Sequence, residues 1–178
     1  NTATLDASAG GATIRVGGNW TNNGTFTPGT STVAFIDSGK TSVISGTNTF
    51  YNLSCEIADK NITVTAGTTQ TISNTLTLNG QAADTRIVLR SSAAGTPFTF
   101  DVTGGSQSVS FVDVKDAQAA SNNIIATSSA NSGGNDDADA VPHWIFGSAV
   151  TITAPTDGKT VGEQPSITGT APAGDTVT

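Results

Sequence analysis

Acidic and basic residues that could act together lie between residues 86 and 116. Asp101 and Asp113 stand in "FDV" and "VDV", each one residue after an apolar position of a predicted strand. Strand alternation therefore predicts that the two carboxylates stack on one outer face. Stacked carboxylates with a cationic partner could hold a cation or perform acid–base chemistry on a polysaccharide. The candidate set is Asp101, Asp113, Asp116, Lys115, Arg86 and Arg90.

The alternative is that these residues are solvated positions that keep a strand edge soluble. The chain has one histidine and two glutamates, Glu56 and Glu163, so it offers few other groups for acid–base work. This scarcity favours a non-enzymatic protein, with a polysaccharide-active enzyme as the alternative.

A second candidate is the polar loop "NSGGNDDADA" at residues 131–140. Calcium takes six to eight oxygen ligands, which closely spaced Asp and Asn residues can supply. The predicted ligands are Asp136, Asp137 and Asp139. The spacing matches no EF-hand, so we expect a plain acidic loop and no cofactor, with a calcium site as the alternative.

Aromatic residues cluster in the first third of the chain and could form a surface for carbohydrate. Alternation predicts that Phe35 and Phe50 point into the core, and Phe26 with them. Trp20 and Tyr51 flank polar residues, so they are the candidate ligand-binding side chains. We nevertheless expect core or rim packing for these two residues as well, with carbohydrate binding as the alternative.

Cys55 is the single cysteine of the chain, so no intrachain disulfide can form. It stands in the alternating stretch "YNLSCEI", which predicts a small buried core residue rather than a nucleophile.

Composition predicts an all-β protein. The chain is rich in Thr, Val and Ile, which favour strands, and has 20 glycines and only 12% charged residues in 178 residues. A net charge of −7 with scattered basic residues argues against a nucleic-acid partner. No apolar run approaches the length needed for membrane insertion. This composition is typical of exported bacterial proteins, so we expect an extracellular or cell-surface location.

Short alternating runs, separated by Gly and Asn turns, predict many strands and no helix. Few turns carry the two-residue hairpin signal, and Asn79–Gly80 is the clearest exception. This pattern favours a parallel β-helix, with a β-sandwich or jelly roll as the alternative. At about 20–22 residues per coil, residues 10–130 would form roughly six coils. The predicted strands are 12–16, 31–36, 41–44, 49–53, 61–65, 75–78, 85–89, 97–102, 108–114 and 123–126.

The chain divides near residue 147. We expect "HWIF" at residues 143–146 to close the open end of a β-helix domain over residues 1–146. Residues 147–178 hold three of the six prolines and are too few to bury a core alone. They form either a linker with the first strands of a further domain or a tail that pairs with another chain. The predicted assembly residues of the tail are Val150, Ile152, Ile167 and Val177.

The stretch "GGNWTNNGTFTPGTSTVAFIDSGKTSVISGTNTFYNL" resembles a repeat of large secreted bacterial surface proteins of the adhesin type. The tail "ITAPTDGKTVGEQPSITGTAPAGDTVT" is similar to the opening strands of bacterial Ig-like modules. These resemblances imply a right-handed parallel β-helix followed by Ig-like modules in an adhesin or surface fibre. Neither identifies a ligand, because a fold does not carry a function with it.

Taken together, we expect a non-enzymatic structural or adhesive module of an extracellular surface protein. A filament subunit that assembles through its C-terminal tail is a sharper form of the same hypothesis. The expected partners are neighbouring copies or adjacent modules of the same protein, and carbohydrate. A polysaccharide-active enzyme and a calcium-stabilised carbohydrate-binding module stay as alternatives.

Overall fold

The computed structural model describes residues 3–136 and 142–147. This part of the chain contains seventeen strands and no helix, which confirms the all-β prediction. Accordingly, it holds no helix that could span a membrane. Every pair of named strands is parallel, which contradicts the sandwich and jelly-roll alternative, since those folds are built from antiparallel strands.

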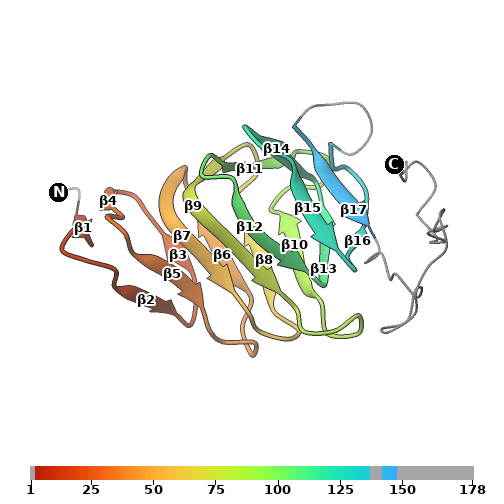
Figure 1. Cartoon of the computed structure of the whole chain (residues 1–178), viewed down its shortest axis with the longest axis horizontal. Helices are drawn as coiled ribbons and strands as arrows, with labels where there is room; N and C mark the ends of the chain where they lie inside the picture. The colour runs from red at the N-terminus through yellow and green to blue at the C-terminus, as the bar shows by residue number, and fades with distance from the viewer. Residues whose placement is uncertain (1–2, 137–141, 148–178) are drawn as a thin grey trace, which may run out of the picture.

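The strands form one large, one medium and one small sheet (Figure 1). In order across the large sheet they are β17 (Trp144–Gly147), β15 (Ile124–Thr127), β12 (Ser106–Ser110), β9 (Thr69–Asn79), β7 (Asn48–Cys55), β5 (Thr32–Phe35) and β2 (Thr13–Val16), with β11 (Phe98–Val102) between β9 and β14 (Ala117–Ala120). The six-stranded sheet contains β16 (Ala130–Asn131), β13 (Val112–Lys115), β10 (Ile87–Ser91), β8 (Asn61–Val64), β6 (Ser42–Ser45) and β3 (Trp20–Thr21). The small sheet pairs β1 (Thr4–Asp6) with β4 (Thr25–Thr27).

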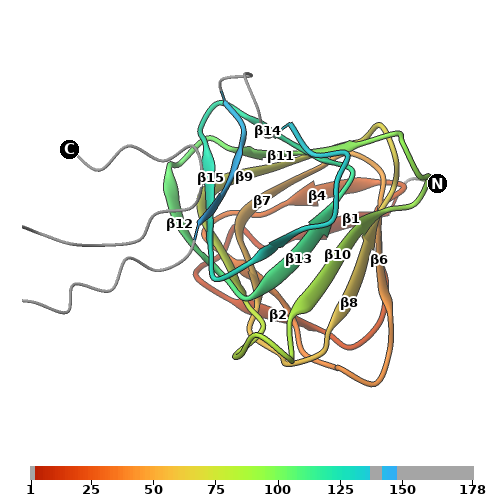
Figure 2. The ribbon, with the colours of Figure 1, turned by 90° about the vertical axis from the view of Figure 1, so that its right-hand side faces the viewer.

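The chain visits these sheets in a repeating order. From β2 it passes to β3 in the six-stranded sheet, continues to β4, and returns to β5 beside β2. We call one such circuit a coil, and each new coil adds a strand beside its predecessor. Seen from the end, the sheets surround a common interior (Figure 2). This parallel path is compatible with a β-helix or solenoid-like class.

The coils are less even than the sequence predicts. Thr32 pairs with Asn52 in the next coil, close to the expected spacing, but Thr75 pairs with Ser106. Extra residues at the corners and a further strand, β11, lengthen that coil. The prediction of an even coil of 20–22 residues is therefore wrong in detail.

The hairpin prediction at Asn79–Gly80 is also wrong, because β9 and β10 lie in different sheets. Gly80 instead allows the loop after β9 to pack closely against the backbone of the neighbouring coil. A Cβ there would lie 2.3 Å from the carbonyl oxygen of Phe111 and 2.7 Å from the Cα of Arg86. Only glycine lets the loop after β9 approach the neighbouring coil this closely.

The core runs along the interior of the stack, with one layer from each coil. Val33, Leu53 and Leu76 occupy equivalent positions on adjacent strands and are each at most 2% exposed. Burial of each such side chain contributes about 1.5–3 kcal/mol. The predicted inward positions of Phe35 and Phe50 are confirmed, and Phe26 is partly buried against the same core.

Trp144 of β17 is fully buried at the last coil described, beside β15, and the closing role of this strand stays a prediction. Its ring lies 6.3 Å from that of Phe100. The predicted Ig-like or strand-donating segment falls on residues 148–178, outside the described residues, so the domain boundary near residue 147 stays a prediction.

Candidate functional site

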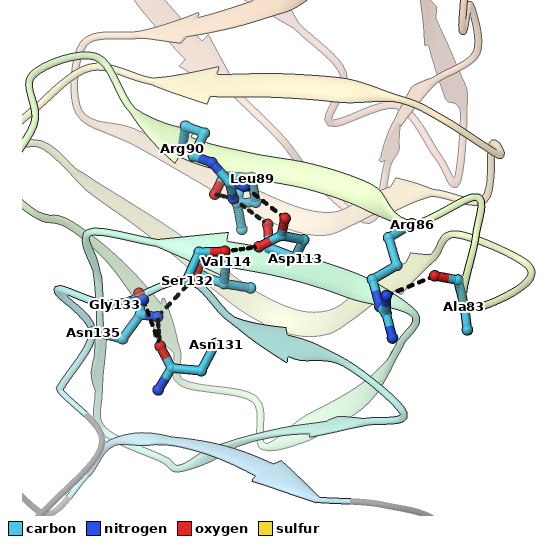
Figure 3. Close-up of polar contacts among 10 residues, drawn as sticks. All are labelled: Ala83, Arg86, Leu89, Arg90, Asp113, Val114, Asn131, Ser132, Gly133 and Asn135. Atoms are coloured by element: carbon cyan, nitrogen blue, oxygen red, sulfur yellow. Dashed lines mark hydrogen bonds and ion pairs between the residues drawn. The ribbon is translucent and has the colours of Figure 1, made fainter.

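The outer face of the six-stranded sheet carries an ion pair between Arg90 of β10 and Asp113 of β13 (Figure 3). The two strands lie side by side, and both side chains occupy outward positions of their alternating strands. Arg90 Nη2 lies 2.7 Å from Asp113 Oδ2, and Arg90 Nη1 donates to the backbone oxygen of Asp113 at 2.6 Å. Ser132 Oγ donates to the other carboxylate oxygen, Asp113 Oδ1, at 2.5 Å.

These contacts keep Asp113 charged. Partial burial raises its pKa, but the hydrogen bonds from Arg90 and Ser132 outweigh burial, and the net pKa lies below the usual 3.8. Both carboxylate oxygens already accept hydrogen bonds. Asp113 is therefore poorly suited to act as a general acid, which needs a raised pKa.

Positive charge gathers around this pair, although the whole chain is acidic. Arg90 is the direct cross-strand neighbour of Lys115, which also faces outward from β13. Arg86 precedes β10, and its charge contributes to the low pKa of Asp113. In Figure 3 the Arg86 guanidinium lies beside Ala83 and apart from the Arg90–Asp113 pair. This face can therefore attract anionic groups.

The predicted stacking of Asp101 on Asp113 is wrong. Asp101 belongs to β11, whose neighbours are β9 and β14 in the large sheet, whereas Asp113 lies in the six-stranded sheet. Asp116 occupies the corner between β13 and β14, where it is 5% exposed and has a φ of 55°. The structure thus pairs Asp113 with Arg90, with Lys115 beside Arg90 and Arg86 further away, and it brings neither of the other two carboxylates to this pair.

The described part of the predicted calcium loop uses its oxygens to bind the protein itself. Asp136 accepts hydrogen bonds from the backbone nitrogens of Ala119, at 2.8 Å, and Trp144, at 3.3 Å. Burial nevertheless raises its pKa. Within residues 3–136 and 142–147 no group of three or more His, Cys, Asp or Glu could hold a metal ion. Asp137 and Asp139 lie outside the described residues, so the calcium site stays a prediction.

The structure buries Trp20, which agrees with core packing and not with an exposed, ligand-binding indole. Trp20 is 7% exposed, and its ring lies 4.9 Å from that of Phe26 and 5.5 Å from that of Phe50. Trp20 Nε1 donates to Asn48 Oδ1, so even its polar atom is used inside the protein. Tyr51, half-buried at a register shift in β7, stays a predicted ligand-binding residue.

Cys55 is 1% exposed, and burial raises the pKa of its thiol to about 11. This confirms the prediction of a core residue, because a nucleophile needs the thiolate.

Sequence reasoning missed the roles of Ser132 and Lys60. Ser132 follows the short strand β16, and nothing in its local sequence indicates that it meets Asp113 one coil earlier. Lys60 is fully buried, and its Nζ donates to the backbone oxygens of Asp37 and Lys40. A lysine beside a predicted strand would ordinarily be placed on the surface.

The predicted assembly residues Val150, Ile152, Ile167 and Val177 all lie outside the described residues. Comparison of the chain with models of known protein families, with curated proteins and with solved structures finds no match.

Proposed function

We propose that this chain is a right-handed parallel β-helix that serves as a non-enzymatic structural and adhesive module of an extracellular bacterial surface protein. The observation that carries the proposal is the dispersal of the candidate catalytic carboxylates. Asp101 lies in the large sheet, Asp113 lies in the six-stranded sheet, and Asp116 lies at the corner between β13 and β14. Asp113 forms an ion pair with Arg90, so its carboxylate links two neighbouring strands.

Two further observations support a structural role. The strands pair in parallel coil after coil, which suits a module that extends along one axis. The outward positions of the large sheet are mostly small hydroxyl or amide residues, as in the ladder Thr32, Asn52, Thr75. Such a face is polar and regular without holding reactive groups.

The module assembles with neighbouring copies through its C-terminal tail. Among the described strands, β2 and β17 each pair on one side only, so each presents a free edge to which a strand can be added. Val150 and Ile152 stand at alternate positions of "AVTITA", the pattern of a strand with one apolar face.

Sedimentation velocity and negative-stain electron microscopy of the full chain over a range of concentrations test this proposal. We expect concentration-dependent end-to-end assembly that is lost in the double variant Val150→Lys/Ile152→Lys. The control Thr151→Lys/Thr153→Lys adds the same charge at the intervening positions and should still assemble. A monomer at every concentration, or equal assembly in both variants, would contradict tail-mediated assembly.

Activity assays test the non-enzymatic part separately. Incubation of the chain with acidic and neutral polysaccharides should release no new reducing ends or unsaturated products. Product release that is lost in Asp113→Asn would establish the enzyme alternative instead.

A further inference from the structure

A cavity of about 480 Å³ lies at the corner where the large sheet meets the six-stranded sheet. Four segments that are distant in sequence line it: the loop between β9 and β10, the corners after β12 and β15, and strand β17. Its volume falls within the range of small-molecule sites. The residues that matter for its chemistry are Arg86, Phe111, Ser128, Ser129 and Phe146.

Arg86 lines this cavity with a guanidinium group that the protein uses only in part. Its Nη1 donates to the backbone oxygen of Ala83 at 2.6 Å, and its Nε is buried, out of reach of a ligand. A guanidinium carries five N–H donors and stays charged at any pH of interest. An acceptor in the cavity would therefore meet the remaining N–H groups of Arg86.

The walls of the cavity are held in place by the backbone. Phe111 and Ser128 occupy equivalent corners of successive coils, and both have left-handed φ values, 51° and 53°. The backbone nitrogen of Phe111 donates to Thr127 O at 3.1 Å, and that of Ile87 donates to Phe111 O at 3.0 Å. A bulky residue is rarely found in this conformation, and such strained positions gather at functional sites. The backbone therefore fixes the two corners from which Phe111 and Ser128 line the cavity.

The lining combines three kinds of contact. Phe111 and Phe146 are half-buried rings that can pack against the carbon face of a sugar. Ser128 offers a hydroxyl group to its polar substituents, whereas the Ser129 hydroxyl already donates to Thr127 O and accepts from Val112 N. The guanidinium of Arg86 binds a carboxylate in a strong, oriented way.

The charge that favours an anionic ligand at this corner is that of Arg86 itself. Lys115 pairs with Arg90 at the other end of β13, away from the cavity, and the exposed Asp84 lies two residues from Arg86. The carboxylate contact therefore depends on the guanidinium and not on a positive patch around it.

We propose that this cavity binds a sugar-acid unit of an acidic polysaccharide, with Arg86 holding the carboxylate and the two phenylalanine rings packing against the sugar ring. The choice of a sugar rests on the adhesive part of the proposed function. The contact with a carboxylate follows from Arg86 alone.

Affinity electrophoresis of the full chain tests the inference, with polygalacturonate in the gel as the acidic probe and dextran as the neutral probe. We expect retardation by polygalacturonate and none by dextran. Arg86→Gln should weaken binding about tenfold or more, because a hydrogen bond to a charged group is lost. The control Arg15→Gln removes the same charge from an exposed position of β2 and should change binding less than about twofold.

If polygalacturonate does not retard the full chain, the inference is overturned. This holds even if the reason is that residues 148–178 fill the cavity themselves. Equal losses in Arg86→Gln and Arg15→Gln would also overturn it, since they would reveal a general effect of charge. If Arg86→Gln lowers the melting temperature, the binding of Arg86→Lys is measured in its place. It keeps the charge without the planar fork, and unchanged binding in Arg86→Lys would contradict the proposed carboxylate contact. The assembly experiment does not involve Arg86, so either proposal can fail while the other stands.

Discussion

Trp20 and Asn48 form a buried side-chain hydrogen bond between successive coils, with Trp20 Nε1 3.0 Å from Asn48 Oδ1. The amide nitrogen of Asn48 lies 2.8 Å from Oε1 of Gln70, one coil further on. Asn48 and Gln70 are at most 2% exposed, so this chain of polar groups runs through the interior and ties three coils together. Buried polar groups stabilise a fold when they are fully paired and cost free energy when they are not.

Asn48→Ala should therefore destabilise the protein. The substitution leaves Trp20 Nε1 buried without an acceptor and removes one partner of Gln70, so we expect the free energy of unfolding to fall by about 2–4 kcal/mol. Urea denaturation measures this change. The control Asn61→Ala alters an exposed asparagine of β8 and should cost less than about 0.5 kcal/mol. If the two variants were equally stable, the buried amide of Asn48 would contribute nothing to the free energy of unfolding.

Lys60→Met should loosen the loop between β5 and β6. The fully buried ammonium of Lys60 bonds the backbone oxygens of Asp37 and Lys40, and methionine fills similar space without donors. We expect a loss of about 2–3 kcal/mol in urea denaturation and faster amide hydrogen exchange in residues 37–41.

The matched control for this loop is Lys40→Met, which removes an exposed ammonium one coil away and should be nearly neutral. If Lys60→Met proved as stable as the wild type, the cost of burying the charge would equal the gain from its two bonds.

The ion pair of Asp113 with Arg90 should give a pH-dependent contribution to stability. The folded-state pKa of Asp113 lies below 3.8, so the unfolded chain binds the proton more readily. The stabilisation is therefore present above pH 3.8 and is lost as the pH falls through the lower, folded-state pKa.

Asp113→Asn should thus cost about 1 kcal/mol at pH 7 and little near pH 2, as measured by denaturation at several pH values. The control Asp84→Asn, at an exposed loop position, should change the free energy of unfolding by less than about 0.5 kcal/mol at pH 7. A cost for Asp113→Asn that stays the same at both pH values would refute the electrostatic origin.

Most of the fold could be predicted from local patterns. Period-two alternation places Val33, Phe35 and Leu53 in the core, and the structure confirms all three. Scarcity of hairpin turns predicts parallel pairing, which the structure also has. These predictions succeed because strand alternation and turn chemistry are properties of neighbouring residues.

Predictions that depended on the register of distant strands were less successful. Asp101 and Asp113 stand in similar tripeptides, yet the uneven coil between β9 and β12 places them in different sheets. Trp20 has polar sequence neighbours, but its burial is decided by Phe50 and Asn48 of the next coil.

The sequence by itself determined that this protein is all-β, that its strands pair without hairpins and which side of most strands faces inward. Only the tertiary structure decided which outward and corner residues meet: Arg90 with Asp113, Ser132 with the same carboxylate, and Arg86 with Phe111 and Phe146 around one cavity. The reason is physical. Alternation repeats every two residues and can be seen locally, whereas contacts between coils depend on the total length of chain between them, which each corner loop changes.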